Sequence, residues 1–160
     1  MNQLKINPAE DLFFDYKVRE MCGSCKRYGK KATCPPHVES VDYYYKLLVQ
    51  FSSGILYYKN FIVGGDWKEQ GKTSSLEIYN YVIAERNRLL KNGHYFIIGF
   101  GAGSCKLCDK CTFPCKQPDQ SLIPFEATGV NVVKTLKKFN IEIEFPIQKH
   151  FYRIGALFYD

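Results

Sequence analysis

The strongest fold signal in this 160-residue chain is an almost continuously apolar run, His94-Tyr95-Phe96-Ile97-Ile98-Gly99-Phe100. A run of this kind is typical of a central strand that is covered on both faces of its sheet. The preceding residues, about 75–92, predict a helix that Ser74 and Glu77 would cap and that Gly93 would end. Its buried stripe would be Leu76, Tyr79, Val82, Ile83 and Leu89.

A second strand is predicted upstream of this helix. Residues 54–63 are rich in β-branched and aromatic side chains, and Gly64-Gly65-Asp66 would begin a loop that lasts through Lys72. The two strands and the helix resemble a βαβ unit, in which the strands are parallel. We therefore expect an α/β fold, with a mixed sheet and flanking helices in a single domain over residues 1–160.

Weaker patterns predict the remaining elements. Further strands are expected at 12–18, 141–145 and 152–159. Helical segments are expected at 38–51, 124–128 and 132–139. Asn131 would cap the last of these, and Gly129 would end the one before it.

Seven cysteines fall into two groups: the N-terminal set of Cys22, Cys25 and Cys34, and the C-terminal set of Cys105, Cys108, Cys111 and Cys115. The C-terminal set reads C-x2-C-x2-C-x3-C, the spacing with which bacterial ferredoxins bind a 4Fe-4S cluster. In the expected fold both cysteine loops leave the carboxyl ends of strands, where open α/β sheets place their ligands. We therefore expect all seven cysteines to converge at this edge and to bind metal.

The number and kind of metal centres stay open at this point. Seven thiolates cannot saturate two clusters of four ligands each, so one iron would lack a cysteine ligand. Cys115 either completes the C-terminal site or crosses to the N-terminal one, and His37 is a candidate for a non-cysteine ligand. The alternatives are a single cluster, or a zinc knuckle formed by the pairs Cys22/Cys25 and Cys105/Cys108.

Residues around the cysteines are weaker indicators. Gly99, Gly101 and Gly103 do not fit the dinucleotide-binding spacing G-x-G-x-x-G, because position 104 is serine; we expect them to let backbone N–H groups approach cluster sulfides. Basic residues near both sets would guide an acidic redox partner or a small anionic substrate, or form a solvated rim: Lys26, Arg27, Lys30, Lys31, Lys106, Lys110 and Lys116.

The net charge and the absence of a predicted secretory or membrane segment limit the expected partners and compartment of the protein. The formal net charge is +6, and two 4Fe-4S cores bound by seven thiolates would lower it to about +3, which is weak evidence for a nucleic-acid partner. The N-terminus has no apolar secretory core, and no stretch is long enough to span a bilayer. An odd cysteine count argues against a disulfide framework, so we expect a cytoplasmic protein with no membrane partner.

These motifs resemble those of a bacterial and archaeal family described as predicted metal-binding proteins, a domain of unknown function. The resemblance spans nearly the whole chain. It rests on the stretches Cys22 through Gly29 with Cys34-Pro35-Pro36-His37, Gly101 through Cys115, and Phe125-Glu126-Ala127-Thr128-Gly129-Val130-Asn131-Val132. Lys116-Gln117 stand where the family pattern has Arg-His, and Pro124-Phe125 where it has Ser-Met. The resemblance implies metal binding and no particular reaction.

Three functions follow as hypotheses. The first is a 4Fe-4S protein with an electron-transfer or redox role in an anaerobic cytoplasm. The second is an enzyme that uses an open iron as a Lewis acid, for example in desulfuration-type chemistry. The third is a zinc-stabilised module that binds protein or nucleic acid, which the lack of a long basic stripe with interleaved aromatics disfavours.

Overall fold

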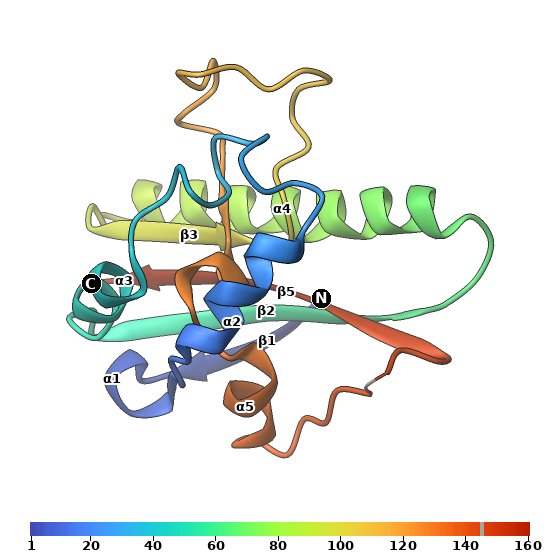
Figure 1. The fold of residues 1–160 in the computed structure, drawn as a ribbon. Coiled ribbons are helices and arrows are strands. Elements are labelled where there is room, and N and C mark those ends of the chain that lie inside the picture. Colours follow the sequence, from blue (N-terminus) through green and yellow to red (C-terminus); the bar gives the residue numbers. More distant parts are fainter. Residues whose placement is uncertain (145) are drawn as a thin grey trace.

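The centre of the molecule is a mixed five-stranded sheet with the strand order β1-β2-β5-β3-β4. The computed structural model describes residues 1–144 and 146–160 (Figure 1). The strands span Asn2–Ile6 (β1), Ser53–Ile62 (β2), Ile97–Gly101 (β3), Ile123–Pro124 (β4) and His150–Tyr159 (β5). The strands expected at 54–63 and 152–159 are confirmed, and the one expected at 94–100 begins later, because Tyr95 and Phe96 are exposed.

The pairing of β5 modifies the expected βαβ unit. β5 is antiparallel to both β2 and β3, so these two strands run parallel to each other but are not neighbours. All ten residues of β5 pair with β2. The sequence could not indicate this insertion, since the strand that separates β2 from β3 comes almost fifty residues after β3.

The helix that links β2 to β3, α4, is longer than expected and spans Trp67–Lys91. Its N-cap is Asp66, whose carboxylate accepts a hydrogen bond from the backbone N–H of Lys68 at 2.8 Å. The expected loop through residue 72 and the expected cap at Ser74 are therefore wrong. Ser74 is instead buried within the helix, where its Oγ accepts a hydrogen bond from Nε of Arg153 at 3.1 Å. The expected end of the helix at Gly93 is confirmed by its φ of 93°.

Helix α4 covers one face of the sheet, and the shorter helices cover the other (Figure 1). The core under α4 includes Ile78, Tyr79, Val82 and Leu89. Ile78, which was not expected in the buried stripe, is fully buried, whereas Leu76 and Ile83, which were, are partly buried. The second core is rich in aromatic residues: Tyr44, Phe100, Phe125 and Phe158. Alternation along β2 and β5 supplies side chains to both cores, as the two-residue period of a strand requires.

Short helices complete the fold on the second face. They are α1 (Pro8–Asp11), α2 (Tyr16–Glu20), η1 (Met21–Ser24), α3 (Val41–Leu48), η2 (Phe125–Thr128) and α5 (Val132–Lys137). The expected turn that ends at Gly129 and the cap at Asn131 are confirmed. The expected strand at 12–18 is wrong, because Asp15 caps α2 through the N–H of Lys17. Residues 141–144 also form no strand, and residue 145 lies outside the described residues.

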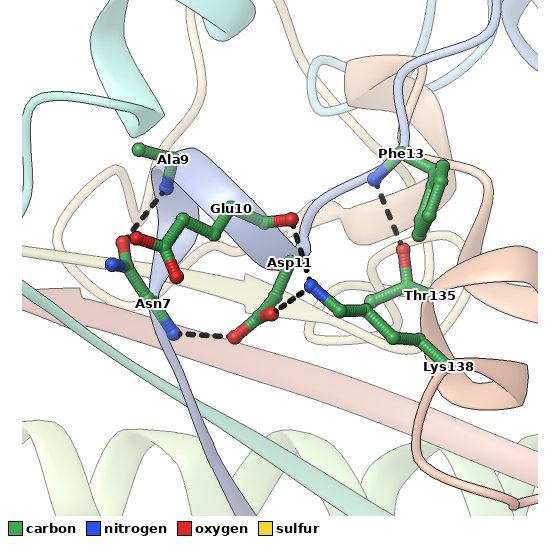
Figure 2. A network of polar contacts seen from close by, with 7 residues as sticks. All are labelled: Asn7, Ala9, Glu10, Asp11, Phe13, Thr135 and Lys138. Carbon is green, nitrogen blue, oxygen red and sulfur yellow. Dashed lines mark hydrogen bonds and ion pairs between the residues drawn. The ribbon is translucent and has the colours of Figure 1, made fainter.

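A polar network attaches the N-terminal segment to α5 (Figure 2). Nζ of Lys138 donates to the backbone oxygen of Glu10 at 3.0 Å and to the carboxylate of Asp11. The backbone N–H of Phe13 donates to Oγ1 of Thr135 at 3.3 Å. This attachment fixes the chain immediately before α2, which leads into the N-terminal cysteine set.

Candidate metal centre

The two cysteine loops meet beside β3, although about seventy residues separate them in the sequence (Figure 1). The backbone N–H of Ala32 in the first loop donates to Sγ of Cys111 in the second at 3.3 Å. The ring of His37 packs on that of Phe113, with 4.4 Å between the centroids. The C-terminal set follows β3, as expected, whereas the N-terminal set begins in η1 after α2 and not at the end of a strand.

The C-terminal set lines a single small cavity, which we call the C-terminal site. Lys31, Ala32 and Thr33 of the first loop form part of its wall. Three of its four sulfurs accept N–H hydrogen bonds: Cys111 from Ala32, Cys108 from the Gln117 amide at 3.3 Å, and Cys115 from the Gln117 backbone at 3.4 Å. Such donors are the usual partners of sulfur that carries negative charge or binds metal.

The N-terminal set lines a separate cavity of about 180 Å³, the N-terminal site. Its far wall comes from the carboxyl ends of the parallel strands β3 and β4, which are followed by Gly103-Ser104 and by Glu126-Ala127. One sulfur of this set accepts a backbone hydrogen bond, from Arg27 N–H to Cys25 at 3.4 Å. The site therefore lies at the sheet edge where open α/β folds bind ligands.

Burial makes two thiols of the N-terminal site, those of Cys34 and Cys22, less acidic than ordinary thiols. It raises the pKa of Cys34 to about 11, and the neighbouring sulfur of Cys25 acts in the same direction. Burial also raises the pKa of Cys22, with the positive charge of Arg19 opposing it and the carboxylate of Glu126 adding to it. These thiols are held as neutral groups unless a cation offsets the charge of the thiolate.

Arg19 fixes the N-terminal loop against the sheet edge. Its guanidinium donates to the backbone oxygen of Ala127 at 2.6 Å and to that of Glu39 at 2.8 Å. A third, longer bond of 3.3 Å reaches the backbone oxygen of Val38. One side chain of α2 therefore joins both ends of the cysteine loop to η2, which carries Glu126.

Glu126 is the site residue that sequence reasoning did not single out. Glu126 lines the N-terminal site, and its Oε2 is buried with no hydrogen-bond partner in residues 1–144 and 146–160. Burial raises its pKa, against the opposing influence of backbone amides at Glu126 and Gly103 and of the charge of Arg153. The available signal was a carboxylate between Phe125 and Ala127, in a segment that otherwise reads as core.

Two larger cavities adjoin the cysteine sites, each of about 640 Å³. The first shares Cys22, Cys25 and Glu126 with the N-terminal site, and most of its wall is apolar: Val18, Met21, Val130, Val132, Val133, Ile143, Ile147, Phe151 and Ile154. The second lies beside Cys105 and Cys108, and we call it the basic cavity because five of its seven charged lining residues are basic: Arg27, Lys31, Lys68, Lys72 and Lys106, against Glu69 and Asp109. Burial lowers the pKa of Lys106, and the charges of Arg153, Arg27 and Lys31 lower it further.

The structure separates several residues that the sequence grouped. The pairs Cys22/Cys25 and Cys105/Cys108 line different cavities, and Cys115 lies with the C-terminal set. His37 is exposed, with its Nε2 3.2 Å from the backbone oxygen of Gly29, and is not part of either cysteine cavity in the described residues.

The glycines of β3 have a packing role that the sequence did not indicate. A Cβ at Gly99 would lie 3.0 Å from Leu157, and one at Gly101 would lie 3.3 Å from Tyr79. These two glycines therefore permit the close packing of α4 and Leu122 on the sheet. The expectation that their N–H groups approach a cluster stays a prediction. Gly103 does line the N-terminal site.

Comparison with known proteins identifies the family and little beyond it. No helix in residues 1–144 and 146–160 has the length and apolar character needed to cross a bilayer. No curated protein and no solved structure matches the chain. The model of one family, domain of unknown function 2284, matches residues 5–159 and carries the description predicted metal-binding protein. The chain therefore belongs to this family of predicted metal-binding proteins.

Proposed function

We propose that this protein binds two 4Fe-4S clusters and transfers electrons in an anaerobic cytoplasm. The observation that carries the proposal is the division of the seven cysteines between two separate cavities, four in one and three in the other. Four thiolates are the usual complement of one such cluster, and the gaps of the C-terminal set match a ferredoxin-type run. When bound, the clusters would supply one-electron chemistry.

The number and spacing of the cysteines support a cluster over a zinc ion. A zinc ion needs four sulfurs at about 2.3 Å from a single point, and this chain has seven cysteines, which line two cavities. A cube of iron and sulfide places each thiolate on a different iron, and the C-x2-C-x2-C-x3-C run of the C-terminal set has the ferredoxin-type spacing. The N–H donors from Ala32 and Gln117 would offset the negative charge on such sulfurs.

The two sites would hold their clusters differently. Cys115 would complete the C-terminal site, which then has four thiolates and suits simple electron transfer. The N-terminal site would have three, which leaves one iron for a ligand of another kind. Arg19 would keep the N-terminal loop in place, and Gln117 would orient two sulfurs of the C-terminal site.

The basic cavity supports an acidic partner for this protein. Five cationic side chains against two carboxylates surround it, and it reaches Cys105 and Cys108 of the C-terminal site. Such a surface attracts an acidic redox protein or a small anionic substrate, and salt would weaken that attraction. The excess of positive charge is local, so it gives no reason to propose a nucleic-acid partner.

Anaerobic purification with iron and sulfide analysis tests the proposed cofactor. We expect a brown protein with about eight iron and eight sulfide per chain, whose visible absorption bleaches reversibly with dithionite. Exchange of electrons with an acidic ferredoxin should slow as the salt concentration rises. A colourless protein with about one zinc per chain would rule out the proposal.

A second function, an enzyme that works at the N-terminal site, has one observation in its favour. The apolar cavity of about 640 Å³ shares Cys22, Cys25 and Glu126 with that site, so a small molecule in it would reach the sulfurs. An iron without a cysteine ligand could act there as a Lewis acid, for example in desulfuration-type chemistry. An electron carrier should have an EPR spectrum that ignores small thiols, whereas an enzyme of this kind should respond to them.

A further inference from the structure

Glu126 lines the N-terminal site together with the three cysteines. Oε2 of Glu126 is buried and has no hydrogen-bond partner in the described residues, 1–144 and 146–160. A buried oxygen without a partner is unfavourable, so its presence in a folded protein requires an explanation. We propose that the Glu126 carboxylate is the eighth protein ligand and completes the cluster site that the N-terminal cysteines leave one ligand short. The inference rests on the proposed function.

The position of Glu126 among the thiols supports this assignment. Glu126 lines two adjoining cavities together with Cys22 and Cys25, so it lies on the same side of the fold as these thiols. It is the only carboxylate among the described residues that line the N-terminal site. His37, the alternative expected from the sequence, is exposed and directed toward the backbone oxygen of Gly29.

The segment that carries Glu126 is held rigidly. Phe125 is fully buried, with its ring 5.7 Å from that of Phe100 and 5.9 Å from that of Phe158. Oγ1 of Thr128 donates to the backbone oxygen of Phe125 at 2.6 Å. Both ends of the turn η2, Phe125 and Thr128, are thus packed into the core, and Glu126 between them lines the N-terminal site. A ligand that is fixed before the metal arrives loses little entropy when it binds.

A carboxylate would give this corner of the site a property that a cysteine would not. It is a harder ligand than thiolate and binds iron less strongly, so another molecule can displace it. Glu126 also lines the apolar cavity, which places the exchangeable corner where a small molecule would enter. In the absence of another molecule, the N-terminal site would thereby retain all four irons. A small molecule could still bind by displacing the carboxylate.

The test compares how easily the site loses one iron. Glu126→Ala, Glu126→Gln and Glu126→Cys are prepared in the full chain, with Glu69→Ala as the control, because Glu69 is an exposed carboxylate in the wall of the basic cavity. All are loaded with iron and sulfide anaerobically and then oxidised mildly, while EPR follows the signal of a 3Fe-4S cluster. We expect this signal to form on the order of tenfold faster in E126A and E126Q than in wild type. E126C and the Glu69 control should resist oxidation as wild type does.

The metal-free variants provide a second readout. A carboxyl oxygen that serves only the metal should not stabilise the empty fold, so E126Q should melt at the temperature of wild type or above it. A lower melting temperature would identify Glu126 as a structural residue and overturn the inference.

The inference and the proposed function can fail separately. If wild type binds no cluster, the proposed function is wrong. If wild type contains both clusters and E126A oxidises at the wild-type rate, the proposed function is supported and the proposed role of Glu126 is wrong.

Discussion

The N-terminal and C-terminal sites use the same C-x2-C unit in very different surroundings. In the C-terminal site, three of four sulfurs accept N–H hydrogen bonds from Ala32 and Gln117, and the cavity is small. In the N-terminal site, one of three sulfurs does, and Oε2 of the lining residue Glu126 is buried with no partner among residues 1–144 and 146–160. The first environment suits a saturated centre, and the second leaves room for a further ligand. Cysteine spacing alone therefore describes the capacity for metal and not its use.

The largest effect should come from removing one cysteine from each site in turn. Cys34→Ser should reduce the iron content from about eight to about four per chain, because it leaves the N-terminal site with two thiolates. Cys111→Ser should instead reduce the iron content of the C-terminal site, and the EPR spectra of the two variants should differ. Loss of all iron from either variant would mean that the two sets share one centre.

The turn that carries Glu126 can be strained without touching any ligand. Gly129 has φ of 89°, and an added Cβ would lie 2.7 Å from Cγ1 of Val41. Gly129→Ala should therefore lower the free energy of unfolding by about 3 kcal/mol in a urea titration. Gly29 also has positive φ, but nothing lies within 4 Å of an added Cβ.

Gly29→Ala is thus the matched control for this strain, and it should cost about 1 kcal/mol. Equal losses in the two variants would show that Val41 yields easily and that the turn is not rigid. The order of the two values decides the point.

The segment around Gly129 shows which parts of the fold can be predicted from the sequence. The turn at 124–128, the end at Gly129 and the cap at Asn131 follow from local chemistry, and all are present. The place of β5 between β2 and β3 does not, because strand pairing depends on contacts between distant residues. The pattern at 12–18 was misleading for a related reason: the cap at Asp15 outweighed the β propensity of its neighbours.

The candidate site divides in the same way. Spacing suggested two groups of cysteines and left the place of Cys115 open; in the structure the two groups line different cavities, with Cys115 beside Cys105, Cys108 and Cys111. That these cysteines bind metal stays a prediction. The contributions of Ala32 and Glu126 could not be predicted, since each depends on how one loop or turn packs against another. The contacts of Gln117 lie within its own loop, but they depend on a loop conformation that the spacing of the cysteines does not specify. Gln117 stands where the family pattern has histidine, which drew attention to the position without revealing its contact with sulfur.

In the metal-free protein, the thiol of Cys34 should be less acidic when the chain is folded than when it is unfolded. Burial moves the pKa of Cys34 from 9.0 to about 11, which favours the neutral thiol. Only the thiolate reacts with iodoacetamide, so Cys34 should react about a hundredfold more slowly below pH 9 than the same residue in urea-unfolded protein. Its rate should continue to rise with pH up to about 11. Mass spectrometry of the alkylated peptides measures this, and equal rates in folded and unfolded protein would contradict it.

The smallest expected effect concerns the hydrogen bonds to sulfur in the C-terminal site. Gln117→Leu removes the side-chain N–H that reaches Cys108 and retains the backbone N–H that reaches Cys115. Because N–H donors stabilise the more negative, reduced cluster, the reduction potential of this centre should become more negative. The potential of the N-terminal centre should stay unchanged in the same redox titration. A shift in both would indicate that the two sites are not independent.

Anomalous X-ray scattering at the iron absorption edge from anaerobically grown crystals tests the two-site account most directly. The account predicts two separate peaks, one among Cys105, Cys108, Cys111 and Cys115, and one beside Cys22, Cys25 and Cys34 next to Glu126. A single peak between the two loops, or scattering at the zinc edge alone, would contradict it.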